Sequence, residues 1–229
     1  MQFTNKLKNN DKFKTLMMDA NIIIPLLDFD YPDKELRNEI VSEVARLITL
    51  DIQLIYSQPC YLEILNYFRN KWIFKACQRM VQYQHSGTHS IKGIIFGAET
   101  RRKAGNDDRY LFDNEVKKIR LALSTNPKVW TGITIATRGK IKILETELNK
   151  LKIDYANFGS KYYPMADKPN WPTWAGMHSM IENYLLASND AAILNMVNYS
   201  SIDGIISNDT DLEFAVTQGA IGTKVLFQI

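Results

Sequence analysis

The chain has 229 residues, 45% of them apolar and 23% charged, which is typical of one large folded domain, or of one with an insertion, and excludes wholesale disorder. Its net charge is only +3, and its first apolar run, residues 22–27, is far shorter than the roughly 20 residues of a membrane span. Because Asp19 and Asn21 also interrupt the core of any secretory signal, we expect a cytoplasmic protein without a membrane partner.

The N-terminal part of the chain predicts two strands and two helices. Apolar runs at residues 14–18 and 53–57 indicate the strands, and apolar residues at helical spacing place a helix over about residues 33–50. A second helix begins at Pro59. Its apolar stripe consists of Tyr61, Ile64, Leu65 and Phe68. Glu63 is predicted to lie on the opposite side of that helix.

The middle of the chain, residues 70–150, holds sixteen Lys and Arg against seven Asp and Glu. It predicts helical stretches at about residues 72–84, 113–123 and 137–151, with a Gly-, Ser- and His-rich turn at 85–97 and a polar break at 104–108. The flanking segments are acidic, with four basic against nine acidic residues over 19–69 and four against eight over 151–229. This division is expected of a metal-dependent enzyme acting on a polyanion, although solvated helix faces also produce such charge runs.

The C-terminal part again alternates strands and helices. The expected elements are a strand at 152–158, a Pro- and Trp-rich loop at 164–174, helices at 175–187 and 189–199, a strand at 204–207, a helix at 211–218 and a strand at 224–228. Because parallel strands require crossover connections, the alternation predicts an α/β fold around a mostly parallel sheet flanked by helices. Cys60 and Cys77 lack a CxxC spacing and indicate two inert thiols in a reducing compartment.

Five carboxylates lie at the ends of the predicted elements, where open α/β sheets bind ligands. Asp19 follows the first strand, Asp209 and Asp211 follow the fourth, Asp190 lies in the first turn of a helix, and Glu63 lies on the helix after the second strand. Neighbouring carboxylates raise one another's pKa, and a bound hard cation relieves the repulsion. Ligation by oxygen alone predicts Mg²⁺ or Mn²⁺.

Each carboxylate also has a purely structural interpretation. Asp190, Asp209 and Asp211 suit the start of a helix, and Glu63 suits an exposed helix face. Asp19 is harder to explain in this way, because a charged residue directly after an apolar strand is poorly placed for core packing. The order of the whole set therefore favours a shared metal site.

In this order the residues resemble the PIN domain family of nucleases in its bacterial form. The positions that match the family pattern are Asp19 with Asn21, Glu63, Asp190, and the run Ser207-Asn208-Asp209-Thr210-Asp211. The resemblance covers about residues 19–69 and 152–229, and it implies a Rossmann-like, five-stranded parallel sheet in the order 3-2-1-4-5. The switch point of that sheet would lie beside Asp19 and Asp209.

The resemblance also implies an activity, which is cleavage of phosphodiester bonds, usually in RNA and often by the toxin of a toxin–antitoxin pair. An antitoxin protein and a second copy in a homodimer are the implied protein partners. Asp19, Asp190 and Asp209 would hold one or two Mg²⁺ or Mn²⁺ ions, whose bound water attacks the phosphate. Glu63 would bind metal or orient the water, and Asp211 would support the metal directly or through water. Asn21 and Ser207 would position the carboxylates by hydrogen bonds.

Two features depart from the family pattern. The interval between Glu63 and Asp190 is long, so residues 70–150 are predicted to form a basic, mainly helical insertion within a single PIN-like domain, 1–229. Leu212 stands where the family commonly has Phe, which changes packing more than chemistry. Contacts to nucleic acid are predicted on the insertion at Arg101, Arg102, Lys103, Lys117, Lys118, Arg138 and Lys140, all of which equally suit solvated helix faces.

Two alternatives stay open. A PIN-like scaffold without catalysis could bind nucleic acid or a protein through the insertion, although such a scaffold is expected to have lost acidic positions that are all present here. A haloacid-dehalogenase-type phosphatase would use residues 22–27 as a strand and Asp28 and Asp30 as its nucleophile pair. Pro25 argues against that strand, because proline cannot donate a ladder hydrogen bond.

Overall fold

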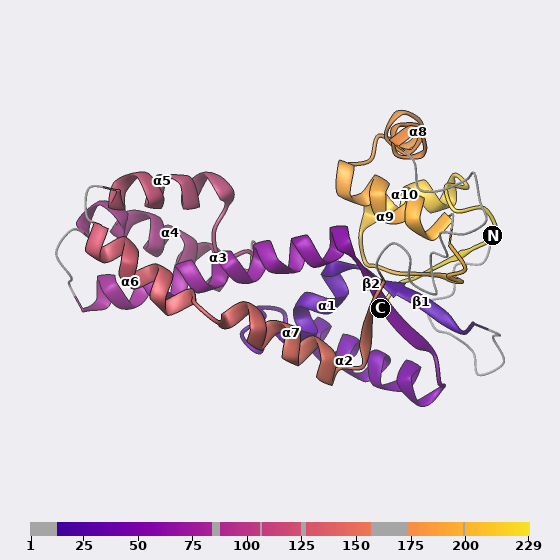
Figure 1. Ribbon diagram of the computed structural model, residues 1–229, viewed down its shortest axis with the longest axis horizontal. Helices are drawn as coiled ribbons and strands as arrows, with labels where there is room; N and C mark the ends of the chain where they lie inside the picture. The colour runs from indigo at the N-terminus through magenta and orange to yellow at the C-terminus, as the bar shows by residue number, and fades with distance from the viewer. Residues whose placement is uncertain (1–12, 84–87, 106, 125–126, 157–173, 199) are drawn as a thin grey trace. The chain divides into compact units, whose positions relative to one another are not determined.

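The computed structural model describes residues 13–83, 88–105, 107–124, 127–156, 174–198 and 200–229. The chain forms two compact units (Figure 1). Unit 1 consists of Met1–Phe29, Glu35–Glu63 and Glu147–Ile229, and unit 2 consists of Asp30–Lys34 and Ile64–Thr146. The predicted loop at residues 164–174 lies outside the described residues except for Trp174.

Unit 1 is built on a five-stranded sheet in which every neighbouring pair of strands is parallel, in the order β3-β2-β1-β4-β5. The strands are β1 (Thr15–Met18), β2 (Gln53–Ser57), β3 (Ile153–Ala156), β4 (Gly204–Ile206) and β5 (Val225–Phe227). Each of them falls within a predicted strand. The prediction of an α/β fold with a parallel sheet in this order is therefore confirmed.

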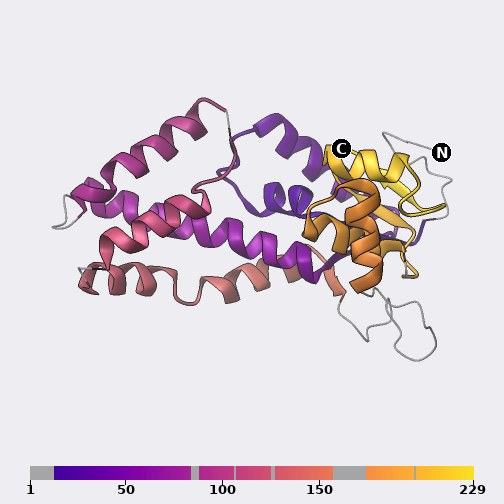
Figure 2. The same cartoon turned by 90° about the horizontal axis from the view of Figure 1, so that it is seen from above.

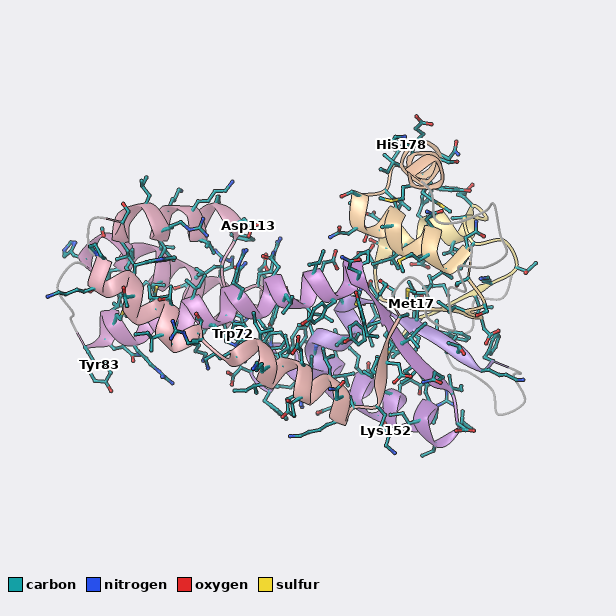
Figure 3. All side chains as sticks on the ribbon, in the orientation of Figure 1. Met17, Trp72, Tyr83, Asp113, Lys152 and His178 are labelled. Atoms are coloured by element: carbon teal, nitrogen blue, oxygen red, sulfur yellow. The ribbon has the colours of Figure 1, made fainter. Side chains whose placement is uncertain are left out.

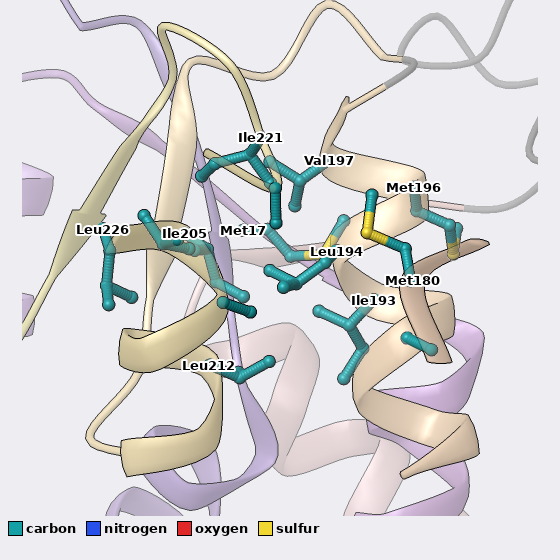
Figure 4. Packing of buried hydrophobic residues seen from close by; sticks show 14 of the residues in the cluster. Met17, Met180, Ile193, Leu194, Met196, Val197, Ile205, Leu212, Ile221 and Leu226 are labelled. Carbon is teal, nitrogen blue, oxygen red and sulfur yellow. The ribbon is translucent and has the colours of Figure 1, made fainter. Parts of the chain in front are cut away.

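One face of the sheet packs against three helices, α8 (Trp174–Tyr184), α9 (Ser188–Asn198) and α10 (Thr210–Thr217). The sheet contributes Met17, Ile55 and Ile205 to this buried cluster, and α9 contributes Ile193 and Leu194 (Figure 4). Because side chains alternate between the two faces of a strand, Met17 and Ile55 mark the face that these helices cover. Burial of this apolar surface is the main force that holds the helices on the sheet.

On the other side of the sheet lie α1 (Ala20–Leu27), which follows β1 directly, and α2 (Lys34–Thr49) (Figure 1). The strand at residues 22–27 that the phosphatase alternative requires is wrong, because these residues belong to α1. Ile22 and Ile23 are fully buried, so their apolar character serves helix packing. Pro25 lies in the last turn of α1, where its missing N–H removes only one helical hydrogen bond.

Unit 2 is predominantly helical (Figure 2). Its elements are most of α3 (Gln58–Gln82), the short 3₁₀ helix η1 (His89–Ile91), α4 (Lys92–Lys103), α5 (Asp113–Leu123), α6 (Pro127–Thr137) and the first part of α7 (Lys140–Lys150). Its core is partly aromatic, since the buried ring of Tyr110 lies 5.7 Å from that of Tyr67 and 5.6 Å from that of Phe74.

Three predictions for this unit differ from the structure. The two helical stretches predicted from Pro59 to residue 84 form the single helix α3. The turn predicted at residues 85–97 is wrong over residues 89–97, which are helical because Ile91, Ile95 and Ala98 recur on one buried face. The helix α6 was not predicted, and Gly139, at φ 78°, separates it from α7.

The side chains follow the amphipathic pattern of these elements (Figure 3). Met17 is fully buried within unit 1, whereas Tyr83 at the end of α3 and His178 on α8 are exposed. None of the helices in the described part of the chain has both the length and the apolar character that crossing a bilayer requires.

Candidate functional site

Asp19 is fixed at the point where β1 ends and α1 begins. Its side chain is only 4% exposed, and its Oδ1 accepts a hydrogen bond from the backbone N–H of Ala20 at 2.6 Å. Its own backbone N–H donates to the carbonyl of Ile206, the last residue of β4, at 3.0 Å. The carboxylate is therefore held between β1 and β4, at the switch point of the sheet.

The hydroxyl of Ser207 joins the two sides of this switch point. It is fully buried, and it donates to Asp19 Oδ2 at 2.7 Å. It also accepts from Asn21 Nδ2 at 3.0 Å and from the backbone N–H of Asp209 at 3.1 Å. A hydroxyl has one donor and two acceptor positions, so Ser207 is saturated. Ser207 and Asn21 thus form the hydrogen-bond frame that orients Asp19.

Asp209 begins α10, next to that frame. Its Oδ1 accepts from the backbone N–H of Asp211 at 2.7 Å and of Leu212 at 3.3 Å, which makes it the N-cap of the helix. Asp211 lies exposed in the first turn of α10. The prediction that Asp209 caps the start of a helix is therefore confirmed. A cap of this kind uses one carboxylate oxygen, and the second oxygen is left for another partner.

Two further carboxylates come from helices that follow other strands. Glu63 lies near the start of α3, just after β2, and its Oε1 accepts a hydrogen bond from Asn189 Nδ2 at 2.8 Å. Asn189 and Asp190 lie in the first turn of α9. This hydrogen bond ties the start of α9 to the start of α3 and brings Asp190 and Glu63 to the same region.

The electrostatics show that the five carboxylates form one cluster. Burial raises the pKa of Asp19 to about 6, and the charges of Glu63 and Asp209 add to this rise, whereas the hydrogen bonds from Ser207 and Ala20 oppose it. Burial, followed by the charges of Asp209, Asp19 and Asp211, also raises the pKa of Asp190 to about 6.

Glu63 responds in the same way. Burial raises its pKa, the hydrogen bond from Asn189 lowers it, and the charges of Asp190 and Asp209 raise it further. Each of the five carboxylates therefore acts on, or is acted on by, at least one other. Among the described residues, however, no three Asp, Glu, His or Cys side chains are arranged closely enough to hold a metal ion without rearrangement.

Besides Asn189, two buried polar side chains near the cluster were not predicted as site residues. Cys60 is fully buried, its thiol donates to the Met18 carbonyl at 3.4 Å, and burial and the nearby charges of Asp19 and Glu63 raise its pKa well above the ordinary value. The thiol therefore stays protonated and unreactive. The buried hydroxyl of Ser57, the last residue of β2, has no hydrogen-bond partner.

Ser57 shares the face of the sheet that carries Ile55 and Met17, because residues two apart on a strand point the same way. A buried hydroxyl without a partner costs about 1–3 kcal/mol. A polar residue at the last position of the second strand was the only signal in the sequence that could have identified it. Ser57 is thus a further polar group beside the ends of β1 and β2 that a bound ligand or water could satisfy.

The predicted nucleic-acid contacts are placed as follows. Arg101 pairs with both carboxylate oxygens of Glu115, at 3.1 and 3.0 Å, and stacks over the ring of Phe112 at 4.0 Å. Arg102 lies 3.6 Å above the ring of Tyr110, and Lys103 pairs with Glu99 at 2.8 Å. The exposed residues of the set are Lys103, Lys117, Lys118 and Arg138, and Lys140 is half-buried. Three of the seven residues are thus already engaged within unit 2.

Comparisons of the chain with family models, with curated proteins and with solved structures found no match. The PIN-like identity therefore stays a prediction that depends on the residues described above.

The raised pKa values predict how the stability of the metal-free protein depends on pH. Because the folded state holds the Asp19 proton more tightly than the unfolded chain, whose pKa is about 3.8, the free energy of unfolding is expected to fall from about pH 4 to pH 6 and then level off. For Asp19 alone, the difference between the folded and unfolded pKa values corresponds to a fall of roughly 3 kcal/mol in the free energy of unfolding. Urea unfolding in EDTA between pH 4 and 7.5 measures this, and the fall should shrink in Asp19→Asn. A stability that increases through this range would contradict the assignment.

Proposed function

We propose that the chain is a divalent-metal-dependent nuclease of PIN-like type that hydrolyses phosphodiester bonds, with RNA as the favoured substrate. The observation that supports it best is the cluster of five carboxylates at the switch point of a parallel sheet, in which burial and mutual repulsion raise the pKa of Asp19, Glu63 and Asp190. Structural caps and surface carboxylates have no need of such an arrangement, whereas a site for a hard cation does.

The donor set fits Mg²⁺ or Mn²⁺ in its chemistry, because all five groups offer carboxylate oxygens and the one nearby thiol, Cys60, stays protonated. In the proposal Asp19, Asp190 and Asp209 are the metal ligands, and Asp211 binds the metal directly or through a water molecule. No coordination sphere is already assembled among the described residues, so the proposal requires these side chains to rotate toward the ion. Asp190 can do so without losing a hydrogen bond that fixes it.

The residues of the chain have distinct roles in the proposed reaction. A bound Mg²⁺ or Mn²⁺ would polarise the scissile phosphate and lower the pKa of a bound water. Ser207 and Asn21 hold the Asp19 carboxylate in one orientation, so that it need not be ordered when substrate binds. In the proposal Glu63, which Asn189 orients and which is partly protected from solvent, accepts a proton from a water molecule.

The proposal is tested with the whole purified chain and a panel of labelled single- and double-stranded RNA and DNA, in Mn²⁺, Mg²⁺ or EDTA. We expect cleavage in Mn²⁺ or Mg²⁺ that EDTA abolishes, with RNA cut faster than DNA. Addition of Mn²⁺ to the metal-free protein should raise the melting temperature, because the ion binds only the folded state. Binding of nucleic acid without cleavage under any of these conditions would favour the non-catalytic scaffold instead.

A further inference from the structure

Two serines flank Asp19 at the carboxyl edge of the sheet in unit 1. Continuing the register of β1 with its two neighbours puts Asp19 level with Ser207 after β4 and with Ser57 at the end of β2. Neighbouring strands are about 5 Å apart, and both serine side chains are fully buried. The Ser207 hydroxyl donates to Asp19 Oδ2 at 2.7 Å, whereas Ser57 Oγ has no hydrogen-bond partner in the described part of the chain.

Ser57 faces the same side of the sheet as Asp19 and Asp190. Its partner on β3, Ala156, belongs to the buried cluster that includes α9, the helix that carries Asp190 in its first turn. Asp19 comes two residues after Met17, which belongs to the same cluster, and its backbone is still extended. Residues two apart on an extended chain point the same way. The Ser57 hydroxyl is therefore directed to the face on which the acidic groups gather.

The start of α3 also places the end of β2 beside Asp19. Cys60, three residues after Ser57, donates its thiol hydrogen bond to the carbonyl of Met18 at 3.4 Å. Asp19 follows Met18 directly, and its charge contributes to the raised pKa of the Cys60 thiol. Because that thiol is engaged and stays protonated, it does not compete with the Ser57 hydroxyl for a polar ligand.

Two structural roles for Ser57 do not fit these contacts. A serine directly before a helix usually caps it, by accepting a hydrogen bond from a backbone N–H two or three residues later. Ser57 directly precedes α3, but among the described residues its Oγ accepts no such bond. A serine retained for its size alone would leave a buried hydroxyl unsatisfied at a cost of about 1–3 kcal/mol, which alanine would avoid. The hydroxyl therefore suits a partner that arrives after folding.

We propose that Ser57 is a positioning residue of the metal site, whose hydroxyl accepts a hydrogen bond from a water molecule held by the ion beside Asp19. This inference rests on the proposed function and deepens it. A hard cation such as Mg²⁺ keeps several waters in a protein site, and hydrogen-bond partners around the ligands fix their orientation. Ser207 already uses all of its hydrogen-bonding positions, and Ser57 uses none among the described residues. Ser207 thus orients the carboxylate, and Ser57 orients the water.

The test measures Mn²⁺ binding by the full chain, without nucleic acid, by isothermal titration calorimetry. Ser57→Ala should weaken Mn²⁺ binding about 10- to 100-fold, the usual effect of removing a hydrogen-bond partner of a metal's ligands. Its melting temperature in EDTA should equal or exceed that of the wild type, because the substitution removes a buried hydroxyl that has no partner among the described residues. Ser57→Thr keeps the hydroxyl and suits a strand, so it should restore most of the affinity.

Two further variants serve as controls. Ser42→Ala makes the same chemical change at an exposed position of α2 and should bind Mn²⁺ as the wild type does. Ser207→Ala removes a hydroxyl that joins three partners, so it should lower both the Mn²⁺ affinity and the melting temperature in EDTA. Loss of affinity without loss of stability thus distinguishes the role of Ser57 from that of Ser207.

Two results would overturn this role. One is a Ser57→Ala variant that binds Mn²⁺ as tightly as the wild type. The other is a Ser57→Ala variant whose melting temperature in EDTA falls as that of Ser207→Ala does, since the hydroxyl would then already have a partner in the metal-free protein.

The outcomes also separate this inference from the nuclease proposal. If the wild type and Ser57→Ala bind Mn²⁺ and cleave RNA equally well, the role of Ser57 is wrong and the nuclease stands. If Mn²⁺ binding depends on Ser57 but the wild type cleaves no nucleic acid, the role of Ser57 stands and the proposed chemistry is wrong. If the wild type binds no Mn²⁺, both are wrong.

Discussion

Asp19→Asn is expected to lose at least about 1,000-fold of the metal-dependent cleavage rate, because a metal ion and its ligands supply several kcal/mol of transition-state stabilisation. The substitution keeps the fold. Asparagine caps helices as well as aspartate does, so the hydrogen bond from the Ala20 N–H to residue 19 can persist. It removes a buried charge whose pKa is raised to about 6, which favours stability at neutral pH, but it also removes the acceptor of the Ser207 hydroxyl, so the two effects oppose each other and the melting temperature should change little. Loss of activity without loss of stability is the signature that we expect.

A matched control is Asp51→Asn, which makes the same chemical change away from the cluster. Asp51 is exposed and precedes β2, at the opposite end of the strand from Ser57. Its φ of 58° lies in the left-handed region, which asparagine tolerates. This variant should cleave at the wild-type rate. Full activity of Asp19→Asn in the same assay would remove Asp19 from the site.

Of the substitutions considered, Gly204→Ala is expected to lower the free energy of unfolding the most. Gly204 lies on β4 between Leu16 of β1 and Val225 of β5, and a Cβ at this position would lie 2.4 Å from the Val225 carbonyl oxygen. Because that oxygen belongs to the backbone of the neighbouring strand, β4 and β5 must separate to admit a methyl group. Overpacking of this kind costs roughly 1–3 kcal/mol, which corresponds to a fall of about 2–12 °C in melting temperature.

Thermal unfolding followed by circular dichroism measures this effect. Gly97→Ala provides the control, because a Cβ at Gly97 in α4 meets nothing within 4 Å and alanine favours a helix. It should leave the melting temperature unchanged or raise it slightly. An unchanged melting temperature for Gly204→Ala would mean that β5 is not closely paired with β4.

The sheet could be predicted from the sequence because each strand is a short apolar run between polar residues, and because alternation with helices leaves few parallel arrangements. The apolar run at residues 22–27 could not be assigned by length, since a buried helix and a buried strand look alike over so few residues. In unit 2 the glycines at 93 and 97 suggested a turn, but tertiary packing of Ile91, Ile95 and Ala98 stabilises a helix there.

The carboxylates could be predicted for a similar reason. Parallel strands share one carboxyl edge, and the family resemblance implied that the first and fourth strands are neighbours, so Asp19 and Asp209 were expected to lie close together. The roles of other residues depend on the fold in three dimensions. No local pattern shows that the Ser57 hydroxyl lacks a partner, or that Glu115 and Phe112 already hold Arg101.

The order of the strands in the sheet also governs how the protein is made. β1 finds β2 early in synthesis, but its other neighbour, β4, leaves the ribosome only after the whole of unit 2 and α9. Until then the growing chain exposes one edge of its central strand, a state that is slow to resolve and prone to association with other chains. Asp19 and Ser207 are separated by 188 positions, so the hydrogen-bond frame forms only near the end of translation. A nascent chain that has not yet reached about residue 211 therefore has no assembled site. The proposed nuclease is expected to be inactive while it is being synthesised.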